Sequence, residues 1–271
     1  MEPNREKHQR EHKGPVTRGG TGFEWFRALA LPVVFFLFSL PSVTGHSVKT
    51  PAEVKVTAKV ELLNSRVKAR NGNIDASGVV VWLEPIDGDS PRGPRTPQKI
   101  LQLGKRFRPH VMAVERGTEV YFPNLDPFFH NVFSVYEGKR FDLGLYASGE
   151  TRPVTFNRVG ISYIFCNIHP RMSAIVVTIP TPYFAISDVE GAVTINNVPE
   201  GHYRLKVWHE RTGDEELAAQ SRAVRVAAGA VNGYDIGLIR LNEAGYMLQP
   251  HKNKHGGQYD SEHSKPSYKR Q

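Results

Sequence analysis

The chain has 271 residues, of which 39% are hydrophobic, 10% aromatic and 23% charged, with 24 glycines, 19 prolines and one cysteine. This balance is typical of a globular protein of one or two domains and excludes extensive disorder. The formal net charge of +8 is spread along the sequence without a concentrated basic face or a reading motif, so nucleic-acid binding is not expected. A single cysteine also excludes an intramolecular disulfide.

An apolar segment near the N-terminus indicates export. Residues 28–41 (ALALPVVFFLFSLP) carry no charge, and the small residues at 42–45 suit signal cleavage. The sequence before the apolar run is long for a signal peptide, so an uncleaved anchor is the alternative, although Pro32 and Pro41 disfavour it. Basic residues before the run should keep the N-terminus inside. We therefore expect residues 1–46 to be a signal peptide or N-terminal membrane anchor, and the rest to be periplasmic or otherwise extracytoplasmic.

The remainder of the chain is predicted to be all-β. Apolar residues alternate or form short runs between glycine, proline and asparagine turns, and no segment keeps helical periodicity over several turns. The expected strands are Val54–Leu62, Gly78–Glu84, Val111–Val114, Glu119–Phe122, Asn131–Val135, Ile161–Cys166 and Ala174–Ile179, with a later group within Val193–Ile239. Residues 87–97, rich in Pro, Gly and Asp, predict a linker or domain junction. The polar residues 244–271 predict a disordered tail.

Two segments carry side chains that suit copper. His130 lies just before one expected strand, and Cys166, His169 and Met172 follow another at Cys-x2-His-x2-Met spacing. Two neutral imidazoles, a thiolate and a long thioether contact form the ligand combination of blue copper. Metal ligation would also explain a lone cysteine in an oxidising compartment, where a free thiol is prone to intermolecular pairing. The spacing therefore predicts a copper site.

The residues around these ligands resemble a known family. The segments FRPHVMAVERGTEVYFPNLDPFFHNVFS and CNIHPRM resemble the cupredoxins, and the short ligand loop is most similar to that of amicyanin. Together with FDLGLY, TPYFAISD and VPEGHYRLKVWHE, they are similar to bacterial plastocyanin-like proteins labelled methylamine utilisation proteins. The resemblance implies a Greek-key cupredoxin β-sandwich over residues 97–180.

The same resemblance implies a role for each ligand position. It makes three residues the equatorial ligands of one type 1 copper ion: His130, Cys166 and His169. Met172 would be the axial ligand, and Asn131 would help to fix the cysteine loop by hydrogen bonding. No residue of the sequence identifies a methylamine dehydrogenase as partner.

A second β-sandwich is expected beside the first. Residues 181–243 resemble a carboxypeptidase regulatory-like (transthyretin-like) domain, a name that implies no peptidase activity. Such modules begin with two further strands, which the N-terminal β segment 47–96 could supply by pairing with residues 181–242. The cupredoxin domain would then be inserted in a loop of the second sandwich.

Other histidines and aromatic residues have ordinary structural interpretations. His110 is expected on a partly exposed strand, and His202 and His209 in the second module lack a surrounding ligand cluster. His46 would chelate copper only if cleavage made it the N-terminus. Phenylalanines are more often core than docking surface, and only Phe128 and Phe129 flank His130 on the loop side.

The sequence favours an extracytoplasmic electron carrier with a type 1 copper cofactor. Four protein ligands would leave no open position for chemistry on a substrate, and no His-x-His or His-Glu-x-x-His motif occurs, so an enzyme is not expected. His169 is the expected electron exit, and an unidentified redox protein the expected partner. A copper-binding or copper-handling protein, and a structural β-sandwich protein with a non-redox site, are the alternatives.

Overall fold

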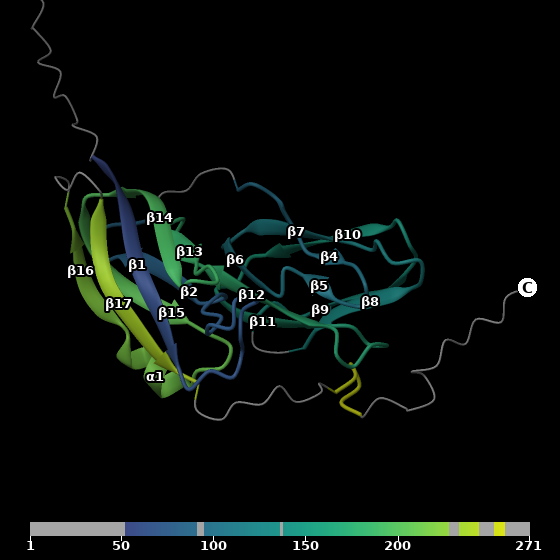
Figure 1. The fold of residues 1–271 in the computed structure, drawn as a ribbon. Coiled ribbons are helices and arrows are strands. Elements are labelled where there is room, and N and C mark those ends of the chain that lie inside the picture. The colour runs from purple at the N-terminus through teal and green to yellow at the C-terminus, as the bar shows by residue number, and fades with distance from the viewer. Residues whose placement is uncertain (1–51, 91–94, 136–137, 228–232, 244–251, 258–271) are drawn as a thin grey trace, which may run out of the picture. The chain divides into compact units, whose positions relative to one another are not determined.

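The computed structural model describes residues 52–90, 95–135, 138–227, 233–243 and 252–257. Residues 1–46, the expected export segment, lie outside the described residues, as does most of the expected tail. In the part of the chain that is described, no helix has the length and hydrophobicity needed to span a bilayer. The described chain is nearly all β, so the all-β prediction is confirmed (Figure 1).

The strands and the short helix follow one another along the chain in a single series. They are β1 (Glu53–Leu63), β2 (Val80–Pro85), β3 (Gln98–Lys99), β4 (Leu101–Gln102), β5 (Phe107–Arg108), β6 (Val111–Glu115), β7 (Thr118–Pro123), β8 (His130–Ser134), β9 (Phe141–Tyr146), β10 (Thr151–Phe156), β11 (Gly160–Phe165), β12 (Ser173–Ile179), β13 (Phe184–Ile186), β14 (Ala192–Pro199), β15 (Gly201–Trp208), α1 (Asp214–Ala219), β16 (Arg222–Val226) and β17 (Tyr234–Asn242).

Two sheets combine the N-terminal strands with the strands after residue 181. One has the order β14-β1-β17 and the other the order β13-β2-β15-β16. Strand β1 pairs antiparallel with β14 and parallel with β17, while β2 pairs antiparallel with β13 and β15. Alternate residues of β1 are buried, because successive side chains of a strand point to opposite faces. Segments far apart in sequence therefore share these two sheets.

The strands between residues 98 and 179 form the remaining sheets. A five-stranded sheet has the order β6-β12-β11-β8-β9, and a three-stranded sheet has the order β10-β7-β3. Strands β4 and β5 form a separate hairpin. All five residues of β8 are buried, which places the start of this strand inside the fold.

Strand β12 contributes to two hydrophobic cores. Its residues Ala174 and Val176 belong to a core with Phe122, Ile164 and Cys166. The alternate residues of the same strand, Ile175, Val177 and Ile179, belong to the core between the other two sheets. The alternation of the strand therefore joins the core that contains Cys166 to the rest of the described chain.

The seven individually expected strands are all present, within one or two residues of their bounds. Strands β9 and β10 were not expected, because Gly144 and Pro153 interrupt their apolar patterns. Both lie at sheet edges, where such residues are tolerated. Helix α1 is too short to give a periodic signal and buries only Leu217. The described residues of the expected linker, 87–90 and 95–97, lie in no strand, and the next strand begins at Gln98.

Candidate metal centre

The site forms where three backbone segments end. His130 is the first residue of β8, Cys166 follows the last residue of β11, and Met172 immediately precedes β12. The Cys166 N–H donates to the Met172 carbonyl at 3.1 Å, and the Met172 N–H donates to the His169 carbonyl at 3.0 Å. These two hydrogen bonds close the Cys166–Met172 loop and carry His169 back over the end of the sheet.

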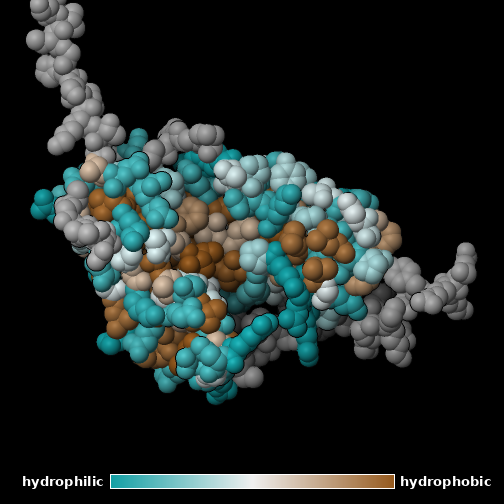
Figure 2. Space-filling model, turned by 45° about the horizontal axis from the view of Figure 1, so that its top comes forward, coloured by the Kyte–Doolittle hydropathy of each residue, from teal (hydrophilic) through white to brown (hydrophobic). Residues whose placement is uncertain are grey.

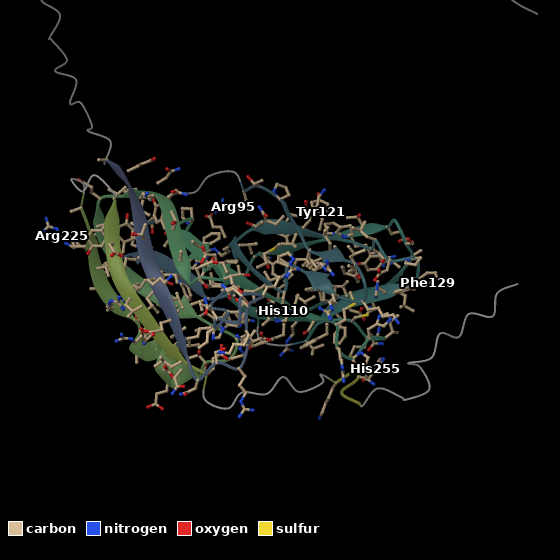
Figure 3. The ribbon with its side chains drawn as sticks, in the orientation of Figure 1. Arg95, His110, Tyr121, Phe129, Arg225 and His255 are labelled. Carbon is tan, nitrogen blue, oxygen red and sulfur yellow. The ribbon has the colours of Figure 1, made fainter. Side chains whose placement is uncertain are left out.

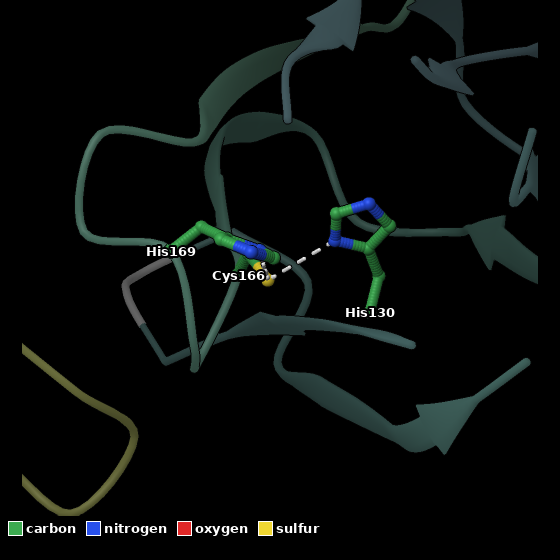
Figure 4. Close-up of side chains that lie close together, drawn as sticks. All are labelled: His130, Cys166 and His169. Atoms are coloured by element: carbon green, nitrogen blue, oxygen red, sulfur yellow. Dashed lines mark hydrogen bonds between the residues drawn. The ribbon is translucent and has the colours of Figure 1, made fainter. Parts of the chain in front are cut away.

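Three of the sequence-predicted ligands converge. The candidate ligand atoms of His130, Cys166 and His169 all lie within 4.8 Å of one another, and they are the one such group of three or more His, Cys, Asp or Glu residues among the described part of the chain. The Cys166 Sγ lies 3.7 Å from His130 Nδ1 and 3.4 Å from His169 Nδ1 (Figure 4). Sulfur and nitrogen ligands held about 2.0–2.3 Å from one metal lie roughly 3.5–3.8 Å apart. The spacing therefore fits a shared metal ion.

The fourth predicted ligand lies in the same core. Met172 is fully buried in the cluster that also contains Cys166. His130 and Cys166 are fully buried too, while His169 is only half-buried. The Phe128 ring lies 5.2 Å from the His130 ring and 5.8 Å from the His169 ring, and so shields both imidazoles. Only His169 among the three clustered residues retains partial access to solvent.

The surroundings keep both imidazoles neutral. Burial lowers the pKa of His130 despite the opposing Asp126 carboxylate. Burial, with repulsion from His130 and Lys105, lowers the pKa of His169 to about 4. Neutral rings present the lone pairs that a metal needs. At neutral pH both nitrogens are therefore ready to bind without losing a proton.

The Cys166 thiol, unlike the two imidazoles, must lose a proton before it can bind a metal. Burial raises the pKa of Cys166, while the backbone N–H groups of Asn131, Ile168 and His169 partly offset that rise. Because a metal binds the thiolate, ligation would release the thiol proton. The three N–H groups then stabilise the negative sulfur.

Asp126, which the sequence analysis did not single out, fixes the His130 ring. Its Oδ2 accepts from His130 Nε2 at 2.8 Å, and its carboxylate also accepts from the backbone N–H groups of Gly104 at 2.7 Å and Lys105 at 2.9 Å. These two residues form the turn of the β4–β5 hairpin with φ of +66° and +56°. Although burial raises the pKa of Asp126, its hydrogen bonds with Lys105, His130 and Gly104 lower it overall. An ionised Asp126 accepts a hydrogen bond from the Nε2–H group of His130. The lone pair of the neutral ring is therefore on Nδ1, which faces Cys166.

Asn131 lies beside the site but its side chain points to a different partner. Its Nδ2 donates to Asp142 Oδ1 at 2.7 Å, and its buried Oδ1 has no hydrogen-bond partner. Its backbone N–H is the group directed at the Cys166 sulfur. The structure thus directs the main chain of Asn131, and not its side chain, at the Cys166 sulfur.

The other histidines that the structure describes lie outside the cluster. His110 Nδ1 donates to the Ser173 carbonyl at 3.1 Å, and its Nε2 lies 2.9 Å from Glu210. His202 pairs with Asp87 on the surface, and His209 is buried next to Glu243. Figure 3 shows His110 near the middle of the view, away from Phe129 at the end of the strands. His46 lies outside the described residues.

Comparison with known proteins gives structural similarities alone. No family model and no curated protein matches the chain. Among solved structures, a copper-containing nitrite reductase from Thermus scotoductus is 25% identical over 35% of this chain and 25% of its own, with a TM-score of 0.30. A purple cupredoxin from Nitrosopumilus maritimus is 22% identical over 31% of this chain and all of its own, with a TM-score of 0.28. The Cu(I) form of an amicyanin variant is 17% identical over 36% of this chain and 98% of its own, with a TM-score of 0.30.

The matched part of the chain is thus similar to cupredoxins, and the chain spans about a quarter of the nitrite reductase. TM-scores this low carry no functional conclusion. A functional proposal must therefore be based on the geometry of the His130–Cys166–His169 cluster.

Proposed function

We propose that the protein is an extracytoplasmic type 1 copper protein that carries single electrons between redox partners. The observation that carries the proposal is the convergence of one ring nitrogen each of His130 and His169 with Cys166 Sγ, all within 4.8 Å. Two imidazole nitrogens and one thiolate are the trigonal donor set of blue copper, and the buried Met172 is the proposed axial ligand. A bound copper ion would supply the one-electron change between Cu(II) and Cu(I).

The chain's own residues would hold the site rigid during that change. Asp126 orients His130, the loop hydrogen bonds place His169 over Cys166, and the Phe128 ring packs beside both imidazoles. With four protein ligands, no position is left for a substrate, so we propose a carrier and not an enzyme.

The half-buried His169 is the proposed exit for the electron. Apolar side chains near the ligand segments reach the surface: Leu125 is 50% exposed and Phe129 is 45% exposed. Phe129 lies at the outer end of the strands in Figure 3. Figure 2 shows hydrophobic surface areas separated by hydrophilic ones on the face it draws. Small apolar contacts of this kind suit a redox protein that binds briefly and leaves.

The same proposal includes the domain organisation. Residues 97–180 would form the copper module, inserted in a second sandwich built from residues 47–96 and 181–243. The pairing of β1 with β14 and β17, and of β2 with β13 and β15, supports this arrangement. The resemblance of the second sandwich to a carboxypeptidase regulatory-like domain assigns that sandwich no catalytic role.

Visible absorption and electron paramagnetic resonance of the full chain with Cu(II) test the function, beside a Cys166→Ser control. An intense thiolate-to-copper band that disappears in the control supports type 1 ligation. A colourless protein, or a copper signal that survives the substitution, contradicts it. Rapid loss of copper to a chelator would instead favour copper handling, and no tight copper binding would favour a structural role.

A further inference from the structure

The C-terminal residues 252–257 contact the ligand loop. The Lys254 backbone N–H donates to Asn167 Oδ1 at 2.9 Å, and Lys254 Nζ lies 2.7 Å from Asp142 Oδ2. Asn253 Oδ1 accepts from the N–H groups of His255 and Gly257, each at 3.0 Å, and this turn presents Lys254. The segment is yellow in Figure 1. The polar composition of the expected tail gave no signal of these contacts.

Both partners of Lys254 adjoin residues of the metal site. Asn167 directly follows Cys166 in the chain. Asp142 accepts from Asn131 Nδ2 at 2.7 Å, and Asn131 directly follows His130. Hydrogen bonds therefore run from Asn131 to Asp142, to Lys254 and on to Asn167. We call this set of four residues the Lys254 bridge.

The bridge links two strands that share little backbone pairing near the site. The register between β8 and β11 contains the single pair Phe133 and Phe165. The Nδ2 group of Asn131 donates its hydrogen bond to Asp142, and the Oδ1 atom of Asn131 has no hydrogen-bond partner. Apart from the contacts made at the Cys166 sulfur itself, the Lys254 bridge thus adds a hydrogen-bonded route from the His130 segment to the Cys166 loop.

We propose that Lys254 is a positioning residue of the metal site, which holds the Cys166–Met172 loop in register with the His130 end of β8. This proposal rests on the proposed function. The Lys254 and Asp142 side chains are 29% and 39% exposed, and exposed ion pairs add little to global stability. Loss of the bridge should therefore loosen the site without unfolding the chain.

The first measurement is the rate at which the copper-loaded full chain loses copper to an excess of chelator. Lys254→Gln should release copper up to about tenfold faster, the lower end of the effect of removing a partner of a metal ligand. Lys254→Arg should keep the wild-type rate. Arg240→Gln is the control for loss of a surface ion pair, since Arg240 forms a 2.8 Å ion pair with Glu61, more exposed than that of Lys254, in another sheet. A Lys254→Gln rate equal to the wild-type and Arg240→Gln rates would overturn the proposal.

A second comparison separates position from charge. Lys254→Gln should lower the reduction potential, because a nearby positive charge disfavours Cu(II), and Asp142→Asn should raise it. The double variant restores the local charge but lacks the ion pair. We expect its potential to return towards wild type while its copper release stays fast. Release that returns to the wild-type rate would show a purely electrostatic effect and overturn the positioning role.

A third readout needs no copper. Amide hydrogen exchange at residues 166–172 of the metal-free chain should be faster in Lys254→Gln than in Arg240→Gln, with equal thermal midpoints. Equal exchange in the two variants would overturn the bridge. If wild type forms no blue site, the proposed function fails alone, because this measurement still reports on the loop.

Discussion

The Asp126 carboxylate accepts a 2.8 Å hydrogen bond from His130 Nε2, on the side of the ring opposite the Cys166 sulfur. The hairpin turn Gly104–Lys105 holds the same carboxylate through two backbone N–H groups. Asp126 is only 4% exposed, so solvent screens this contact weakly. A turn more than twenty residues before His130 thus fixes which imidazole nitrogen faces the candidate metal.

Asp126→Asn should weaken copper binding about tenfold and raise the reduction potential. The amide oxygen can still accept from Nε2, but the negative charge that favours Cu(II) is gone. Titration of copper affinity and voltammetry check this result. Asp235→Asn is the control, because the Asp235 carboxylate accepts a hydrogen bond from a backbone N–H, that of Gly237, within β17. An unchanged potential in Asp126→Asn would show that the contact is structural only.

Met172→Leu should keep the blue band and raise the reduction potential. Leucine fills nearly the same buried volume, so the change in unfolding free energy should stay below about 1.5 kcal/mol. Removing a weak axial donor destabilises Cu(II) more than Cu(I), which shifts the potential upward. Absorption spectra and voltammetry test both expectations. A potential and spectrum identical to wild type would remove Met172 from the ligand set.

The sequence predicted the strands near the site because their apolar residues alternate or form short runs. It also predicted the residues that cluster, His130, Cys166 and His169, because the short loop and the preceding strand restrict where they can lie. Local spacing carries that information. It does not state which polar groups surround the ligands.

The supporting residues depend on contacts between distant segments. Gly104 and Lys105 reach Asp126 through a hairpin turn, and Lys254 reaches Asp142 across 112 residues. Asp126 precedes His130 by four residues, which is the one signal in the sequence that could have pointed to it. Lys254 lies in a polar tail whose composition resembles any solvated segment, so no local pattern distinguishes it.

Acid should destabilise the chain through His209. This residue is 3% exposed, and burial together with Arg211 lowers its pKa to about 4, against the opposing Glu243 and Glu210. The unfolded pKa is about 6.5, so the unfolded chain takes up a proton first. The stabilisation is complete above pH 6.5 and is lost as the pH falls towards 4.

Between pH 7.5 and 5 this effect should cost about 2 kcal/mol of unfolding free energy, and His209→Gln should lack it. Denaturant unfolding of both proteins at the two pH values gives the difference. The lowered pKa of Glu243 adds a loss in acid, and the raised pKa of His110 acts in the opposite direction, but both groups are present in the two proteins. Equal pH dependence in both would contradict the assignment to His209.

Unfolding of the described β structure should be a single transition, because β12 supplies side chains to both cores. Ile175 packs in the core between the sheets that contain β1 and β2, while its neighbours Ala174 and Val176 pack beside Cys166. Ile175→Ala should cost about 2–5 kcal/mol as a buried large-to-small change. The loss should lower the unfolding midpoint seen by tryptophan fluorescence, through Trp82 and Trp208, and the midpoint seen by the copper band to the same extent. A lowered fluorescence midpoint with an unchanged copper-band midpoint would show instead that the two modules unfold independently.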